Sequence, residues 1–193
     1  MKLLEDRISA QGIAINKDVL KVDMFLNHQI DPVLIDAMGA EFAEKFKNDG
    51  VTKILTVEAS GIPIAYATAL KMGVPFVFAK KGNHSNVGND VYCAGCHSFT
   101  KNKDYTMIVS RKFISADDTI LIIDDFLANG AASDGLTEIV NQSGAKLAGI
   151  GIAIEKGFQP GGKKIRQSGV KLCSLAIVDE MDEGKIVFRK QVD

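Results

Sequence analysis

Two adjacent carboxylates, Asp124 and Asp125, are the residues of this sequence best suited to chemistry. They directly follow the apolar run 120–123, which is continuous rather than alternating and therefore predicts a strand buried on both faces of a parallel sheet. Charged side chains are seldom buried without partners, so we expect the pair at the carboxyl end of this strand. Open α/β sheets bind their ligands at that edge.

Small residues separate the two acids from a helical pattern. They are Ala128, Asn129, Gly130, Ala131 and Ala132. Backbone N–H groups in such a loop, at the amino end of a helix, can hold a phosphate. The carboxylates can accept hydrogen bonds from sugar hydroxyls or hold Mg²⁺, so together the two parts suit a phosphorylated ribose. The simpler alternative is an acidic strand end followed by an ordinary loop.

A second strand–loop–helix unit lies earlier in the chain. The predicted strand 53–57 ends at Glu58, Ala59, Ser60 and Gly61, and a helix opens at Ile62 and Pro63. Its backbone N–H groups can bind a second anion, although an isolated turn of this kind is just as often an ordinary βα connection. The predicted strand 74–79 ends at Lys80 and Lys81, whose charges could neutralise a pyrophosphate. For Lys81, a solvated surface position is an equal alternative.

Strands alternate with helices along the chain, which predicts an α/β fold with a mostly parallel central sheet flanked by helices. With 193 residues, the chain is expected to form a single domain, 1–193. The segment 82–105 is long, polar and rich in glycine and asparagine, so we expect a flexible loop there.

Composition and charge exclude several classes of protein. The net charge is −1 and there is no basic stripe, which argues against a nucleic-acid partner. No apolar run approaches the roughly 20 residues that a membrane span needs. The amino terminus becomes charged too soon for a signal peptide, so we expect a cytoplasmic protein with its three cysteines reduced.

One motif suggests a different class of protein. Cys93-Ala94-Gly95-Cys96-His97 has the spacing of a c-type haem attachment site, and its cysteines also suggest zinc or a thioredoxin-like centre. Haem attachment requires export, zinc needs two further ligands that are not obvious in the sequence, since Cys173 is far from the motif, and a thioredoxin motif should open a helix. We expect two reduced thiols in the polar segment, with a haem or zinc protein as the less favoured alternative.

The strand, acid pair and small loop around Asp124 and Asp125 resemble the signature of type I phosphoribosyltransferases, which bind 5-phosphoribosyl-1-pyrophosphate (PRPP). The resemblance covers nearly the whole chain. It implies the type I phosphoribosyltransferase fold, with a small N-terminal hood contributed by about residues 1–30, a mobile loop over the site, a homodimer, and Mg²⁺ carried in by the substrate. Asn129 stands where many members have threonine, which replaces a hydroxyl contact to phosphate by an amide.

The resemblance also implies roles for individual residues. Asp124 and Asp125 would hold the ribose hydroxyls as catalytic residues, and the loop 128–132 would hold the ribose phosphate. The pyrophosphate would bind at Glu58, Ala59, Ser60, Gly61 and Lys80.

The base is expected to be a 6-oxopurine. Lys156 has only hydrogen-bond donors, which suit ring carbonyls and suit the amino group of adenine poorly. The resemblance of segment 20–27 adds Asn27 as a donor to a second carbonyl and Leu20 as a wall of the base pocket, and it favours xanthine, which would be converted to xanthosine 5′-monophosphate with release of pyrophosphate. A transferase for guanine or hypoxanthine and a non-catalytic regulator that binds PRPP are the alternatives. For Lys156, a structural salt bridge is the alternative role.

Overall fold

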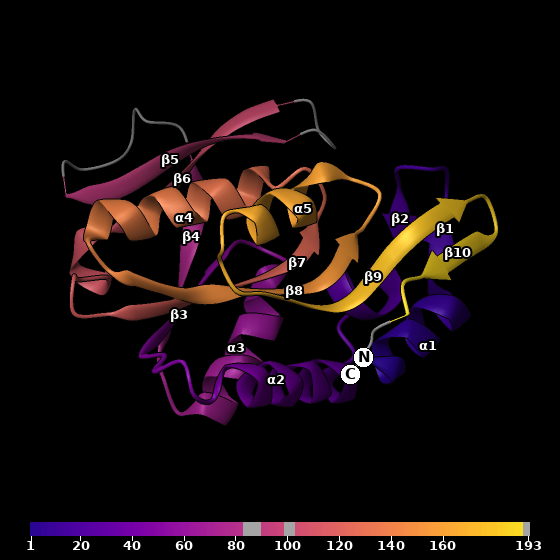
Figure 1. The fold of residues 1–193 in the computed structure, drawn as a ribbon, viewed down its shortest axis with the longest axis horizontal. Helices are drawn as coiled ribbons and strands as arrows, with labels where there is room; N and C mark the ends of the chain where they lie inside the picture. Colours follow the sequence, from indigo (N-terminus) through magenta and orange to yellow (C-terminus); the bar gives the residue numbers. More distant parts are fainter. Residues whose placement is uncertain (83–89, 99–102, 191–193) are drawn as a thin grey trace.

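The computed structural model describes residues 1–82, 90–98 and 103–190, and within them the main sheet has eight strands in the order β10-β9-β8-β7-β3-β4-β6-β5 (Figure 1). Their bounds are β3 Lys53–Val57, β4 Phe76–Gly82, β5 Val91–Ser98, β6 Lys103–Ser110, β7 Thr119–Leu127, β8 Lys146–Lys156, β9 Leu172–Asp182 and β10 Lys185–Phe188.

The middle of the sheet is parallel. Strands β9, β8, β7, β3 and β4 are parallel to one another, whereas β10 and the β5–β6 hairpin run antiparallel at the two edges. Strand β7 lies between β3 and β8, and its residues 120–123 have no exposed surface. This confirms the predicted α/β class and the prediction that the continuous apolar run is buried on both faces.

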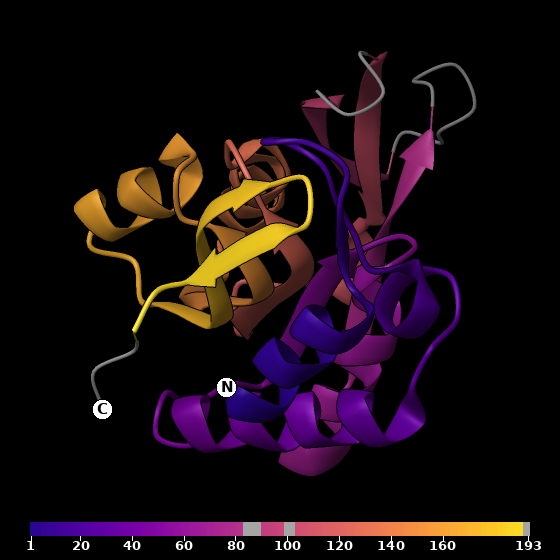
Figure 2. The same cartoon turned by 90° about the vertical axis from the view of Figure 1, so that its right-hand side faces the viewer.

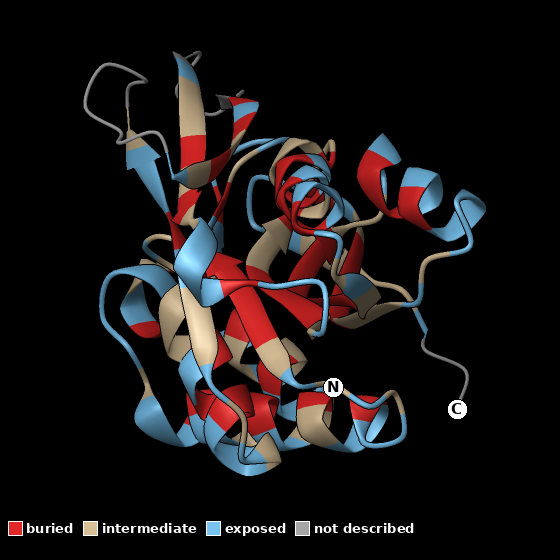
Figure 3. Cartoon of the chain, turned by 90° about the vertical axis from the view of Figure 1, so that its left-hand side faces the viewer, coloured by how far each residue is buried: buried red, intermediate tan, exposed pale blue. Residues whose placement is uncertain are grey.

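Helices cover both faces of the sheet (Figures 1 and 3). The helices are α1 Lys2–Gln11, α2 Pro32–Phe46, α3 Gly61–Met72, α4 Ala131–Ser143 and α5 Pro160–Gln167. One buried cluster joins the sheet to α1, α2 and α3, and the other joins it to α4, α5 and the β5–β6 hairpin. Helix α2 begins at Pro32 because Asp31 Oδ1 accepts hydrogen bonds from the N–H groups of Val33 and Leu34 at 3.0 and 3.1 Å.

The N-terminal segment forms a separate small unit. Strands β1 (Ile13–Ala14) and β2 (Leu20–Lys21) pair antiparallel, and a π-helix, η1, follows over Asp23–Asn27. Figure 2 shows this hairpin beside the β9–β10 hairpin. Neither a helical nor a strand period can be recognised in the sequence here, because two-residue strands and a π-turn are too short to establish one.

The structure corrects two predicted boundaries. Strand β7 does not stop before the acids but continues through them to Leu127, because its pairing with β8 extends to Glu155. The segment 82–105 is not wholly a loop, since β5 and β6 pair in continuous register from Val91–Ser110 to Ser98–Lys103. The rest of the predicted loop, 83–89 and 99–102, lies outside the described residues.

In the part of the chain that the structure describes, no helix is long and apolar enough to cross a membrane.

Candidate active site

The two predicted carboxylates lie in the last four residues of β7, at the carboxyl end of the sheet. Asp124 is 4% exposed, and Asp125 is half-buried. The N–H of Asp125 donates to Asp124 Oδ1 at 3.0 Å, and the N–H of Phe126 donates to Asp125 Oδ1 at 2.9 Å. Both side chains are therefore held by the backbone of the strand that carries them.

The environment of this pair opposes its ionisation. Burial raises the pKa of Asp124 well above its ordinary value, and the charge of Asp125 raises it further. Burial also raises the pKa of Asp125, against the opposing hydrogen bond from Phe126. The ammonium of Lys81 lowers the pKa of both carboxyl groups, which places a cation within electrostatic reach of the pair. Positive charge brought by a ligand favours the same ionised form.

The first anion loop, between β3 and α3, lies directly against this pair. A Cβ atom built on Gly61 would be 2.1 Å from Thr56 Oγ1 and 3.1 Å from Asp124 Oδ1, so only glycine fits there. Thr56 Oγ1 is itself a buried atom that lacks a hydrogen-bond partner within the described ranges. The peptide bond between Glu58 and Ala59 is cis. The loop and the carboxylates thus form one continuous site.

The end of β4 closes the other side of this loop. The N–H of Lys81 donates to Glu58 Oε1 at 2.6 Å, which ties the start of the loop to β4. The Lys81 ammonium lies 5.0 Å from the centroid of the Tyr105 ring. Its charge also lowers the pKa of Asp124. Lys80 is also exposed, but its side chain leaves the opposite face because successive side chains alternate along a strand. Lys81 is therefore the lysine that the structure brings to the carboxylates.

The second anion loop joins β7 to the amino end of α4. Gly130 has a φ of 95°, a conformation that glycine adopts without steric cost, and Asn129 Oδ1 accepts from the N–H of Ala131 at 3.0 Å. The N–H of Gly161, in the first turn of α5, donates to the carbonyl oxygen of Ala128 at 3.0 Å. The predicted residues 128–132 thus lie together at the amino end of α4, where the first turn of α5 contacts them through Gly161.

Lys156 occupies the end of β8 and faces the N-terminal unit. Its ammonium donates to the carbonyl oxygen of Asp18 at 2.5 Å and lies 5.7 Å from the centroid of the Phe126 ring. Burial lowers its pKa, against the opposing charge of Asp18. Leu20 is buried two residues beyond Asp18, in β2, and Asn27 is exposed at the end of η1. Glu155, the neighbour suggested for a structural salt bridge of Lys156, pairs with Arg166 instead.

Three features of this site are not among the predictions from the sequence: the placement of Lys81 beside the carboxylates, the contact of Lys156 with Asp18, and the support of the loop 128–132 by Gly161. Of these, only the placement of Lys81 could be predicted from the sequence pattern. Lys81 lies two residues after the buried Ala79 and therefore shares its face of β4.

The cysteine motif lies in β5 rather than in a loop. Cys93 and Cys96 are three residues apart on a strand, so their side chains leave opposite faces. Burial raises the pKa of the Cys96 thiol. Counting only residues whose placement is described, no group of three or more His, Cys, Asp or Glu side chains is arranged to hold a metal ion. All three cysteines are free thiols.

Asp124 and Asp125 make a two-carboxylate donor set. Mg²⁺ is commonly bound through one or two carboxylates together with substrate phosphates, while it keeps several waters. The pair therefore fits a Mg²⁺ ion that arrives on its substrate.

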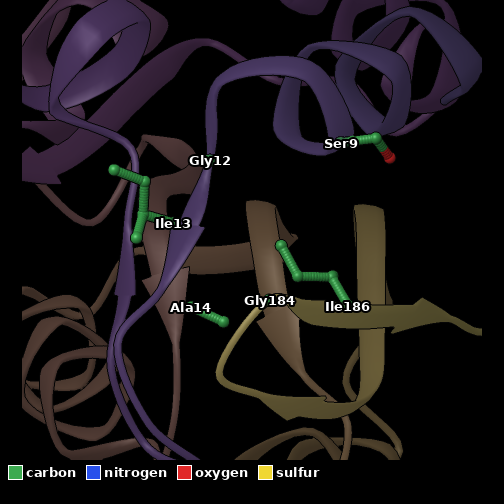
Figure 4. Close-up of a pocket in the computed structure, with 6 residues that line it drawn as sticks. All are labelled: Ser9, Gly12, Ile13, Ala14, Gly184 and Ile186. Atoms are coloured by element: carbon green, nitrogen blue, oxygen red, sulfur yellow. The ribbon is translucent and has the colours of Figure 1, made fainter.

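One pocket is lined by none of the predicted residues, although its Ala14 pairs with Leu20 in the β1–β2 hairpin. It has a volume of about 420 Å³ and lies between the N-terminal unit and the β9–β10 hairpin (Figure 4). It is lined by Ser9, Gly12, Ile13, Ala14, Gly184 and Ile186. Since Ser9 is its one hydroxyl-bearing or charged side chain, the pocket offers no chemistry comparable to the strand ends.

Known proteins match this chain over nearly its full length. The phosphoribosyl transferase domain family matches residues 22–185. The xanthine phosphoribosyltransferase of Ruminiclostridium cellulolyticum is 54% identical over 188 residues, which are 97% of this chain and 99% of that protein. That of Stutzerimonas stutzeri is 50% identical over 188 residues, again 97% of this chain and 99% of its own.

Solved structures confirm the type I phosphoribosyltransferase fold. The APRTase of Giardia lamblia, complexed with 9-deazaadenine, has a TM-score of 0.75 at 23% identity and covers 90% of this chain and 96% of its own. The adenine phosphoribosyltransferase of Rhodothermus marinus has a TM-score of 0.72 at 18% identity, over 92% and 99% of the two chains. With the domain match and the full-length relatives, these findings show that the chain belongs to the phosphoribosyltransferase family, among the xanthine phosphoribosyltransferases.

Proposed function

We propose that this protein transfers the phosphoribosyl group of PRPP to xanthine, forming xanthosine 5′-monophosphate and pyrophosphate. The observation that carries the proposal is that one acid pair lies against the loop between β3 and α3 and directly precedes the loop between β7 and α4. Gly61 of the first loop packs against Asp124, and the second loop starts three residues after Asp125. We propose xanthine as the base because the relatives named above are xanthine phosphoribosyltransferases.

The acid pair acts on the ribose. As carboxylates, Asp124 and Asp125 accept hydrogen bonds from the two ring hydroxyls and place negative charge beside C1, where positive charge develops as the pyrophosphate leaves. Lys81 already lowers the pKa values of both acids, and the positive charge of Mg²⁺ and of the ribosyl centre would lower them further. Mg²⁺ supplies charge neutralisation for the pyrophosphate oxygens.

The two loops hold the anionic ends of the substrate. Residues 128–132 bind the ribose phosphate at the amino end of α4, through backbone N–H groups and the helix dipole. Residues Glu58, Ala59, Ser60 and Gly61 bind the pyrophosphate, with charge from Lys81 rather than from Lys80, whose side chain leaves the opposite face of β4. Holding both ends fixes C1 between them, which is the main requirement of a displacement that needs little covalent help.

The base binds between β8 and the N-terminal unit. Lys156 exchanges the carbonyl oxygen of Asp18 for the 6-carbonyl of the purine, because both are acceptors for the same ammonium. Asn27 donates to the 2-carbonyl of xanthine, and Leu20 forms the wall of the pocket. In this arrangement, residues 1–30 act as the hood that covers the base.

A homodimer is the proposed assembly. Helix α3 presents Tyr66 and Leu70, which are 57% and 63% exposed, and Val33 in the first turn of α2 is 74% exposed. Large apolar side chains exposed together often mark protein interfaces.

The decisive experiment mixes the protein with Mg²⁺, PRPP and one purine at a time, and follows nucleotide formation. Xanthosine 5′-monophosphate should form with the highest kcat/KM when xanthine is the base. A preference for adenine would contradict the role of Lys156, and guanine or hypoxanthine as the best substrate would contradict the role of Asn27. Binding of PRPP without turnover with any of the four bases would contradict catalysis.

A further inference from the structure

An ion pair between the buried Glu155 and the partly exposed Arg166 lies next to the site but outside the groups that contact substrate in the proposed function. Glu155, at the end of β8, is 1% exposed. Its two oxygens accept hydrogen bonds from Nη1 and Nη2 of Arg166 in α5, both at 2.7 Å, and Ser174 of β9 donates to the same carboxylate. Burial would raise the pKa of Glu155, but the Arg166 and Ser174 hydrogen bonds outweigh it and hold the pKa below its usual value.

This cluster fixes the amino end of α5. A Cβ atom on Gly162 would be 2.0 Å from Glu155 Oε1, so the helix backbone packs directly on the carboxylate. With only eight residues, α5 depends on tertiary contacts for its position: this one, the buried Ile165 and the ion pair of Lys164 with Asp134 in α4. A bidentate pair between a carboxylate and a guanidinium sets the orientation as well as the distance of the two elements.

The fixed end of α5 in turn supports the phosphate loop. The N–H of Gly161 donates to the carbonyl of Ala128, and a Cβ atom on Gly161 would be 2.5 Å from that oxygen and 2.8 Å from the nitrogen of Gly130. One unbroken set of contacts therefore runs from Glu155 through α5 to the loop. Lys156, the next residue along, leaves the opposite face of β8 toward the base.

We propose that Glu155 and Arg166 are positioning residues for the phosphorylated ribose: through α5 they hold the loop 128–130 in the shape that binds the phosphate. The inference rests on the proposed function, which places the ribose phosphate in that loop. Because Glu155 and Lys156 face opposite sides of the sheet, disturbing the cluster affects the ribose phosphate and leaves the base site unchanged.

The test measures binding of ribose 5-phosphate by calorimetry, together with KM for PRPP and for xanthine. Arg166→Leu should weaken ribose 5-phosphate binding and raise KM for PRPP by about tenfold each, as expected for a loop displaced by a fraction of an ångström. KM for xanthine should stay within about twofold, since an intact Lys156 contact leaves its ΔG unchanged. Arg166→Lys, which keeps the charge, should recover part of the loss. Lys163→Gln, an exposed position on the same helix, is the matched control and should behave as the wild type.

The outcomes separate the two proposals. Unchanged ribose 5-phosphate affinity in folded Arg166→Leu, or an equal loss for xanthine, would overturn the positioning role alone. A wild-type protein that binds no ribose 5-phosphate would overturn the proposed function and this inference with it. If Arg166→Leu does not fold, as circular dichroism will show, Glu155→Gln carries the same comparison with the side-chain shape preserved.

Discussion

Gly61 and Asp124 are in such close contact that a methyl group on the glycine would stand 3.1 Å from the carboxylate oxygen, and 2.1 Å from the hydroxyl oxygen of Thr56. The loop that we propose binds the pyrophosphate and the acid that we propose binds the ribose are therefore parts of one packed unit. A ligand that contacts both the loop and Asp124 must have its leaving group and its sugar at adjacent positions, as PRPP does.

Gly61→Ala should remove most activity for this reason. The new methyl group must displace Thr56, Asp124 or the loop backbone, and overpacking of this kind costs about 1–3 kcal/mol of stability. We expect kcat/KM to fall by roughly 100-fold, as for other misplacements of reacting groups by about 1 Å. Steady-state kinetics and urea unfolding measure the two effects. Gly95→Ala, where a Cβ atom meets nothing within 4 Å, is the control, and an equal loss in both variants would contradict the argument.

Asp124→Asn should inactivate the enzyme and at the same time stabilise the fold. The pKa of Asp124 is raised in the folded state, so this state holds its proton at pH values where the unfolded chain has lost it. The wild type therefore loses stability as pH rises from the ordinary aspartate range through the raised pKa, whereas the amide does not.

Urea unfolding at pH 4 and pH 8 tests this predicted change of stability with pH. The stability advantage of Asp124→Asn over the wild type should be larger at pH 8, while kcat falls by at least about 100-fold, the scale of losing one electrostatic contact to the transition state. Asp117→Asn, at an exposed position, should show neither effect. A variant that is less stable than the wild type at pH 8 would show that the carboxylate has a structural role.

Lys81→Met should weaken the binding of PRPP and move the acid limb of the pH–rate profile to higher pH. The ammonium lowers the pKa of both carboxyl groups, so removing it leaves them protonated to a higher pH. We expect KM for PRPP to rise about tenfold at pH 7, the loss of one charge-assisted contact. Lys80→Met is the matched comparison, and an acid limb that moves only in that variant would reverse our assignment of the two lysines.

Lys156→Met should impair recognition of the base with little effect on the sugar. Losing a charged donor to the purine carbonyl costs about 1.5–3 kcal/mol, so KM for xanthine should rise by about 10- to 100-fold while ribose 5-phosphate binds as before. In the wild type, burial lowers the pKa of Lys156, so the cation is lost at a lower pH than in an ordinary lysine and KM for xanthine should rise on the alkaline side. Lys146→Met, at the exposed opposite end of β8, is the control. A change in the affinity for ribose 5-phosphate instead would place Lys156 elsewhere.

The sequence by itself determined the α/β class and the position of both anion loops. These follow from local patterns: an uninterrupted apolar run is buried, a pair of acids marks the carboxyl end of its strand, and glycine and alanine allow a backbone to approach a phosphate. The start of α2 at Asp31 and Pro32 is local in the same way, since capping involves neighbouring residues only.

Only the tertiary structure decided which side chains meet. The extension of β7 through Asp124 and Asp125, and the strands within 82–105, depend on pairing with segments distant in sequence. The choice of Lys81 over Lys80 depends on which face of β4 packs toward Asp124. The support of Ala128 by Gly161 and the Glu155–Arg166 pair join residues that no local pattern relates, because long-range packing is set by the whole sheet rather than by any one stretch of chain.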